Sequence, residues 1–199
     1  MNDNATPVAT RERLLEAAWR CVTEAGLEGA TSRAITAGAA ANLGAITYHF
    51  GSKEDLIAEA AAEAIERLVT PALAALQDES VDPATRLLQS LGRLQEAYTR
   101  SAADAPAYLE VLLHARRAGT GDRLTMRLGR VRTAVAGQLV ALQAQGVVPA
   151  WVDPEPMAAL LLAVAEGVVL QAVADPGGPA VGAMADQFAR LLLASQTTS

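Results

Sequence analysis

Hydrophobic residues recur at intervals of three and four along most of this chain, the spacing that buries one face of a helix. The first such segment runs from Thr10, a suitable helix cap, to about Ala25, where Gly26 is placed to end it. Two shorter segments follow, at about 31–39 and 43–50. The spacing therefore predicts three helices before Gly51, the last two of only about two turns each.

A fourth, longer helix is predicted immediately after these three. Ser52 is followed three residues later by Asp55, which is the capping-box spacing, and apolar residues continue in helical steps to Leu68. Pro71 is expected to end or kink this helix, because proline lacks the amide hydrogen that a helix needs. The same spacing predicts five further helices, at about 83–100, 106–118, 122–146, 155–174 and 179–196. The fold class predicted is all-α, with about nine helices.

Composition supports a helical fold, and the charge is unevenly distributed. Aromatic residues make up 4% of the chain, and the net charge is −6 at pH 7. Residues 29–53 contain Arg33 and Lys53 and no acid, whereas residues 54–79 contain seven acids against Arg67 alone. An acidic body with one acid-free tip is compatible with a DNA reader whose non-specific affinity is modest.

The acid-free segment ends in a run of side chains that form hydrogen bonds. Asn42, Thr47, Tyr48, His49 and Lys53 supply amide, hydroxyl, phenol, imidazole and ammonium groups within a few turns. Groups of these kinds contact base edges and phosphates. The alternative is that the short helices belong to a larger bundle and that the aromatic side chains only pack within it. Short helices bury little area, however, and entry into a DNA groove is one reason for an exposed helix of this kind.

Three linked segments resemble the DNA-binding domain of the TetR (tetracycline-repressor-like) family. They are Thr10-Arg11-Glu12-Arg13-Leu14-Leu15-Glu16-Ala17-Ala18 with Glu24-Ala25-Gly26-Leu27, then Thr31-Ser32-Arg33-Ala34-Ile35, then Tyr48-His49-Phe50-Gly51-Ser52-Lys53-Glu54. The resemblance implies a flexible arm at 1–9, a helix-turn-helix domain at 10–52, a connecting helix at 53–75 and a bundle for ligand binding and dimerisation at 76–199. One departure is Ala40-Ala41, where the family usually has Gly-Val at the turn between its second and third helices.

The resemblance also implies roles for individual residues. The residues expected to face bases in the major groove are Asn42, Leu43, Gly44 and Thr47, and Asn42 is equally suited to cap its helix. The residues expected to contact phosphates are Thr31, Ser32, Tyr48, His49 and Lys53. Arg33 is a candidate for either kind of contact, and its alternative is a solvated surface arginine.

The resemblance implies a sequence-specific transcriptional regulator, a repressor that binds a palindromic operator as a dimer and is released by a small-molecule effector. The last two predicted helices are apolar on more than one face, which indicates a second partner beyond the chain's own core. The resemblance places an effector pocket within 83–175. The candidate ligand contacts are Tyr98, Tyr108, Leu112, Met126 and Glu166.

Other functional classes find little support in the sequence. There are two histidines and one cysteine, and no catalytic triad, phosphate-binding loop or metal-spaced cluster is evident, so we expect no enzyme, cofactor or metal site. The N-terminus lacks a signal peptide, and Glu166 and Gln171 interrupt the longest apolar run, so we expect a cytoplasmic protein that does not bind membranes. The remaining alternative is a helical dimeric interaction module that does not bind DNA.

Overall fold

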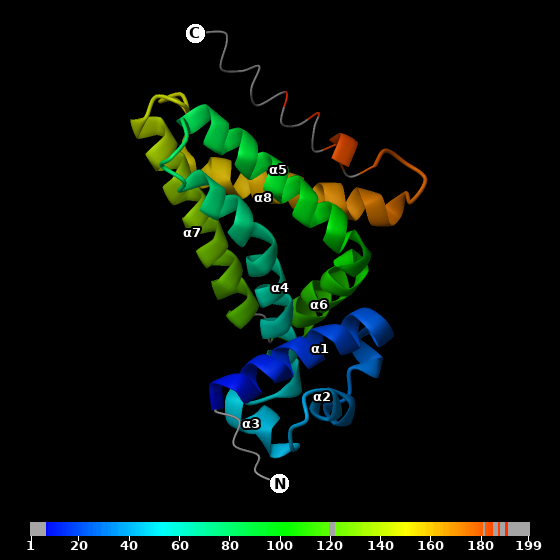
Figure 1. Cartoon of the computed structure of the whole chain (residues 1–199). Coiled ribbons are helices and arrows are strands. Elements are labelled where there is room, and N and C mark those ends of the chain that lie inside the picture. The colour runs from blue at the N-terminus through cyan, green and yellow to red at the C-terminus, as the bar shows by residue number, and fades with distance from the viewer. Residues whose placement is uncertain (1–6, 120–121, 181, 185–186, 188–189, 191–199) are drawn as a thin grey trace. The chain divides into compact units, whose positions relative to one another are not determined.

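The computed structural model describes residues 7–119, 122–180, 182–184, 187 and 190. Within these residues the chain forms eight α-helices, one short 3-10 helix and no strand, which confirms the all-α prediction (Figure 1). The elements are α1 (Pro7–Gly29), α2 (Ser32–Gly38), α3 (Gly44–Phe50), α4 (Lys53–Leu76), α5 (Pro83–Ser101), η1 (Ala102–Asp104), α6 (Ala105–Ala118), α7 (Asp122–Ala144) and α8 (Pro154–Ala174). The predicted ninth helix, 179–196, falls mostly outside the described residues.

Contacts within the chain divide it into two compact units. The first comprises the chain up to Ile65 together with Pro106–Leu128, and the second comprises Glu66–Ala105 and the chain from Gly129 onward. Helices α4 and α7 therefore each contribute residues to both units.

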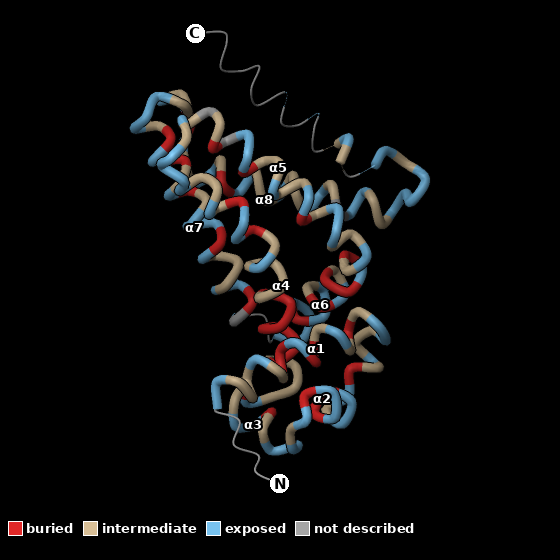
Figure 2. Tube along the Cα trace, viewed as in Figure 1, coloured by how far each residue is buried: buried red, intermediate tan, exposed pale blue. Residues whose placement is uncertain are grey.

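The core of the first unit is built by the apolar faces of α1 to α4 and α6. Leu14, Leu15 and Val22 of α1 are buried, as is Phe50 at the end of α3, and buried positions gather along these helices in Figure 2. Val111 of α6 belongs to the same core. The short helices α2 and α3 are thus held by tertiary packing, because helices of seven residues have little stability of their own.

The first helix changes direction where the sequence predicts its end. Gly26 has φ +69° and ψ −179°, a conformation outside the helical region that glycine adopts readily, although helical turns resume up to Gly29. The prediction of a stop at Gly26 is therefore confirmed as a break within α1.

Helix α4 does not end at Pro71 but runs on to Leu76. Of the two outcomes expected at Pro71, an end to the helix is wrong, and a kink stays a prediction. A proline removes one helical hydrogen bond, yet both Val69 and Ala72 are buried in this region. Burial of the helix on either side of Pro71 compensates for the missing bond.

In the second unit, a small core of Ala136, Leu139 and Ala158 joins α7 to α8. Arg86 of α5 is also buried, and its guanidinium donates hydrogen bonds to the Leu76 carbonyl and to Oε1 of Gln145. This arginine ties α5 to the ends of α4 and α7.

Candidate DNA-binding interface

Helix α3 has one face in the core and one face in solvent. Ile46 and Phe50 are buried, whereas Thr47 is exposed and Tyr48 has 79% of its surface accessible. The residues that lead into the helix, Asn42 and Leu43, are exposed as well, as is Gly44 in its first turn. The residues that the sequence assigns to base contacts therefore lie together at one exposed end of the first unit.

Asn42 caps the start of α3. Its Oδ1 accepts a hydrogen bond from the backbone N–H of Ala45 at 3.0 Å, and its backbone carbonyl accepts from the same group at 3.1 Å. Of the two roles left open for Asn42, the capping role is present in the fold. The side-chain NH₂ group takes no part in this bond and remains a donor for a ligand.

The turn between α2 and α3 is a Schellman motif with alanine in place of glycine. The N–H of Ala41 donates to the carbonyl of Thr36 at 2.9 Å, and the N–H of Ala40 donates to that of Ala37 at 3.2 Å. Ala40 has φ +49°, in the left-handed region that favours glycine. The Ala40-Ala41 departure from the family pattern is therefore accommodated by a strained alanine.

Two arginines of α1 stabilise this turn from the side. Nε of Arg13 donates to the carbonyl of Ala39 at 3.0 Å, and Nη2 of Arg20 donates to that of Gly38 at 3.4 Å. Both acceptors are carbonyls at the end of α2, where a helix lacks internal donors and a positive charge is favourable. These contacts fix the end of α2, from which the chain turns into α3.

We expect Ala40→Gly to stabilise the protein. Glycine relieves the backbone strain at φ +49°, and part of that gain is offset because glycine also frees the unfolded chain, so the net effect is about 0.5–1 kcal/mol. Ala40 is exposed, so the change leaves no cavity. Urea unfolding in a Trp151→Phe background measures the effect, because the fluorescence then reports Trp19, which packs against the core of the first unit. A loss of stability would contradict the assigned strain.

The candidate phosphate contacts at the start of α2 also serve its structure. Oγ1 of Thr31 accepts from the N–H of Ala34 at 3.2 Å and caps the helix. Thr31 and Arg33 are exposed, and Ser32 is half-buried. The hydroxyls and the guanidinium thus stand at a helix N-terminus with no acidic residue in its first turn, an environment suited to phosphate.

The segment between α3 and α4 follows the predicted capping pattern. Oγ of Ser52 accepts from the N–H of Asp55 at 3.0 Å and donates to its carboxylate at 2.8 Å. The half-buried ring of His49 packs edge-on against Tyr48, with the ring centres 4.8 Å apart. Lys53 lies 3.7 Å from a carboxylate oxygen of Glu54, so part of its charge is already compensated.

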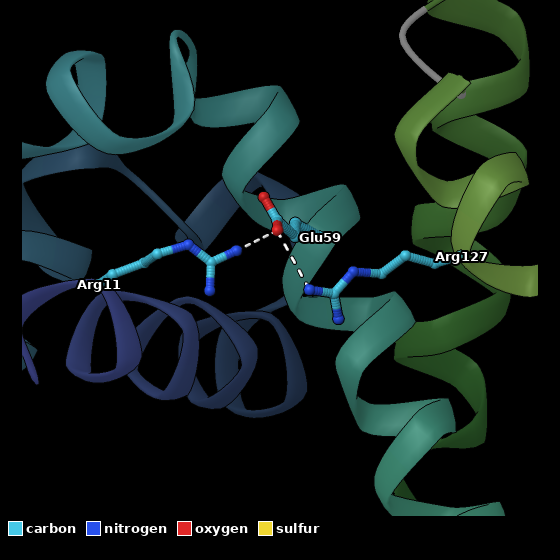
Figure 3. A network of polar contacts seen from close by, with 3 residues as sticks. All are labelled: Arg11, Glu59 and Arg127. Atoms are coloured by element: carbon cyan, nitrogen blue, oxygen red, sulfur yellow. Dashed lines mark hydrogen bonds and ion pairs between the residues drawn. The ribbon is translucent and has the colours of Figure 1, made fainter. Parts of the chain in front are cut away.

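A buried carboxylate joins three helices of the first unit (Figure 3). Glu59 of α4 is 9% exposed, and its Oε1 accepts from Arg11 of α1 and, at 3.2 Å, from Arg127 of α7. The guanidinium carbon of Arg11 also lies 5.3 Å from the centre of the Phe50 ring. Arg11 therefore links the end of α3 to α4 through a cation–π contact and an ion pair.

The second unit contains an apolar cavity of about 330 Å³ lined by α4, α5, α7 and α8. None of the described residues that line it is charged, and four can form side-chain hydrogen bonds: Ser90, Gln95, Tyr98 and Gln138. Burial, with a smaller contribution from the nearby Glu166 carboxylate, raises the pKa of Tyr98 to about 12. Its phenol therefore stays protonated at neutral pH and remains a donor.

The five candidate ligand residues do not come together. Tyr98 lines this cavity, and burial raises the pKa of the neighbouring Glu166. Tyr108 and Leu112 pack in the cores of the first unit, and Met126 is exposed. Ser90, Gln95 and Gln138 were not predicted, because nothing in the local sequence distinguishes a cavity-facing polar residue from an exposed one.

Helix α8 is long and apolar enough to span a membrane by length and composition alone, and little of it is buried within the chain. Leu160 and Leu170 each leave about half of their surface accessible. The apolar surface of α8 thus exceeds what the described part of the chain covers.

Helix α1, the two short helices α2 and α3 with the fixed turn between them, and the exposed face of α3 define a helix-turn-helix protein. The family model described as "Bacterial regulatory proteins, tetR family" matches residues 14–60. Over 62 residues the chain is 44% identical to the HTH-type transcriptional repressor AcnR of Corynebacterium efficiens, which covers 31% of this chain and 33% of AcnR. Over 166 residues it is 24% identical to the HTH-type transcriptional regulator PksA of Bacillus subtilis, covering 83% of this chain and 80% of PksA.

A comparison of folds extends the similarity to the whole chain. GusR of Salmonella enterica superposes with a TM-score of 0.69 at 28% identity, covering 98% of this chain and 97% of GusR. The DNA-binding domain of this chain, residues 14–60, belongs to the TetR family of bacterial transcriptional regulators. Membership of this family of regulators confirms the prediction that the protein is not an enzyme.

Proposed function

We propose that this protein is a cytoplasmic, ligand-responsive repressor that binds a palindromic operator as a homodimer. The observation that carries the proposal is the exposed, acid-free face of α3, held at a fixed turn by Arg13 and Arg20. A helix presented in this way fits the major groove of DNA.

The roles that we propose for the individual residues come from the resemblance to the family and agree with their exposure. Leu43, Gly44 and Thr47 face bases together with the NH₂ group of Asn42. The residues that contact phosphates are Thr31, Ser32, Tyr48, His49 and Lys53, and Arg33 contacts either a phosphate or a base. Phosphate contacts set the position of the protein on DNA, and base contacts select the sequence.

Dimerisation is supported by the surface of α8. A helix that is apolar on more than one side requires more partners than one chain supplies, and an isologous contact through α8 provides the second. A dimer has two copies of α3 and therefore makes twice as many contacts with DNA as one chain does. The two copies match two half-sites that lie one helical turn of DNA, or several whole turns, apart. The membrane is not the partner we propose, because the family regulates transcription.

The effector that we propose is an uncharged, largely apolar molecule bound in the cavity of the second unit. The lining offers apolar surface and a few neutral hydrogen-bonding groups, and a buried charge without a partner is costly. Val69, Ala72 and Leu73 of α4 line this cavity, and only two residues separate the start of α4 from the end of α3. An effector changes DNA binding only through a difference in its affinity for the DNA-binding and released states.

The DNA-binding proposal is tested by selection of duplexes from a random pool with the full-length protein. We expect enrichment of an inverted repeat, two chains bound per duplex, and affinity that falls steeply with salt. A dimer that binds no duplex in a salt-dependent manner would instead support the helical interaction module.

The cavity is tested with a matched pair of ligands and a matched pair of variants. We expect 1-decanol to displace the uncharged dye Nile red from the protein, and decanoate at pH 8 to do so far less, because no charge lines the cavity. Gly92 lines the cavity, and nothing lies within 4 Å of a Cβ added at this position. Gly92→Leu should therefore fill the cavity and weaken decanol binding about tenfold.

Gly137→Leu is the control for this test, because Gly137 is an exposed position of α7 outside the cavity lining. It should bind decanol as the wild type does. Equal binding of decanol and decanoate, or unchanged binding by Gly92→Leu, would contradict the assigned site.

A further inference from the structure

We call residues 42–50, which contain α3, the recognition segment. The exposed surface of this segment carries no formal charge. Residues 42–50 contain no arginine, lysine, aspartate or glutamate, and the exposed members are Asn42, Leu43, Gly44, Thr47 and Tyr48. Guanine is read most often by the two donors of arginine or by lysine, and cytosine by a carboxylate acceptor. Neither kind of contact is offered by this segment.

The adenine contact is also restricted, because Asn42 is already in use. A bidentate contact to adenine needs the side-chain oxygen of asparagine as acceptor and its nitrogen as donor. Oδ1 of Asn42 accepts the N–H of Ala45 at 3.0 Å and so holds the start of α3. The second lone pair of Oδ1 and the NH₂ group remain available, but the cap fixes the direction in which both point.

Leu43 presents an apolar group at the same end of the segment. It is 52% exposed, and it lies four residues before Thr47, so both residues fall on one side of the helical turn. Gly44, between them, has no side chain to hold the segment away from a surface. The segment therefore offers an isobutyl group and the methyl group of a threonine with little around them.

We infer that Leu43, supported by Thr47, reads the 5-methyl group of thymine in each half-site. Thymine is the base that places a methyl group in the major groove, and apolar side chains recognise it by contact. The NH₂ group of Asn42 then donates to a neighbouring acceptor, such as O4 of thymine or N7 of a purine. This inference rests on the proposed DNA-binding function and identifies the base that the recognition helix selects.

The test uses duplexes selected by the full-length wild-type protein, with each thymine replaced singly by uracil. This exchange removes the methyl group and keeps every hydrogen-bonding group. At one or two positions in each half-site we expect uracil to weaken binding about fourfold, the effect of one buried methyl-sized group. Replacement in both half-sites should weaken binding about sixteenfold.

Leu43→Ala should remove the difference between thymine and uracil at those positions. The control is Leu113→Ala, since Leu113 of α6 is equally exposed at 54% and lies outside the recognition segment. That variant should retain the difference in full. Circular dichroism verifies that both variants are folded.

Failure of the proposed DNA-binding function and failure of this inference alone give different results. Absence of any selected duplex would overturn the proposed function and this inference with it. Selected duplexes that bind equally well with uracil at every position, or a thymine preference retained by Leu43→Ala, would overturn the inference alone.

Discussion

Glu59→Ala should destabilise the first unit by about 2–3 kcal/mol. The carboxylate is 9% exposed and accepts hydrogen bonds from Arg11 and Arg127, so its removal leaves two guanidinium groups facing each other without the anion between them. Breaking a fully buried ion pair costs about 3–5 kcal/mol, and we expect less here because the Arg11 side chain is about one third exposed.

The effect should extend to DNA binding. Arg11 lies over the ring of Phe50 at the end of α3, so loss of its anion loosens the contact that holds the recognition helix to α4. Urea unfolding of a Trp151→Phe background measures the stability, because the fluorescence then reports Trp19 in the first core.

An exposed ion pair supplies the matched control. Arg93 and Glu96 of α5 lie 3.7 Å apart with both side chains largely in solvent, so Glu96→Ala should cost less than about 0.5 kcal/mol. Equal losses of stability in Glu59→Ala and Glu96→Ala would show that the contacts of Glu59 with Arg11 and Arg127 stabilise the protein no more than a surface ion pair does.

Gly51→Ala should destabilise the same unit by about 2 kcal/mol and weaken DNA binding with it. Gly51 ends α3 with φ +88° and ψ −52°, a conformation that residues with a side chain rarely adopt. A Cβ at this position would lie 3.7 Å from a carboxylate oxygen of Asp55, an ordinary contact distance. The cost therefore comes from the backbone and not from crowding.

The control for Gly51→Ala is Gly129→Ala, a helical position of α7 with nothing within 4 Å of an added Cβ. That change should stabilise by about 0.5–1 kcal/mol, because alanine favours a helix over glycine. Both variants are measured by urea unfolding. A Gly51→Ala protein as stable as the wild type would contradict the strain assigned to this turn.

The local features of the helix-turn-helix domain could be predicted from the sequence. The break at Gly26 and the Ser52–Asp55 capping box depend on residues within one helical turn of each other, and both are present. Local hydrogen bonds of this kind are determined by side-chain chemistry at short spacing.

Features that depend on distant partners could not be predicted in the same way. Glu59 belongs to an acid-rich stretch, yet it is buried because Arg11 and Arg127 come from 48 and 68 residues away. The positive φ of Ala40 contradicts alanine's own preference, and the arginine contacts to Ala39 and Gly38 come from α1. The cavity residues likewise come from four helices, so no local pattern marks them.

The central claim is that the exposed face of α3 binds DNA, and the most direct measurement compares two exposed aromatic residues. Tyr48→Ala and Trp151→Ala each remove a side chain that is mostly in solvent, one on α3 and one before α8. Affinity for the selected duplex is measured by fluorescence anisotropy across a salt series. We expect Tyr48→Ala to weaken binding about tenfold across sequences, through a lost phosphate contact, and Trp151→Ala to bind as the wild type does. Unchanged affinity of Tyr48→Ala would contradict the claim.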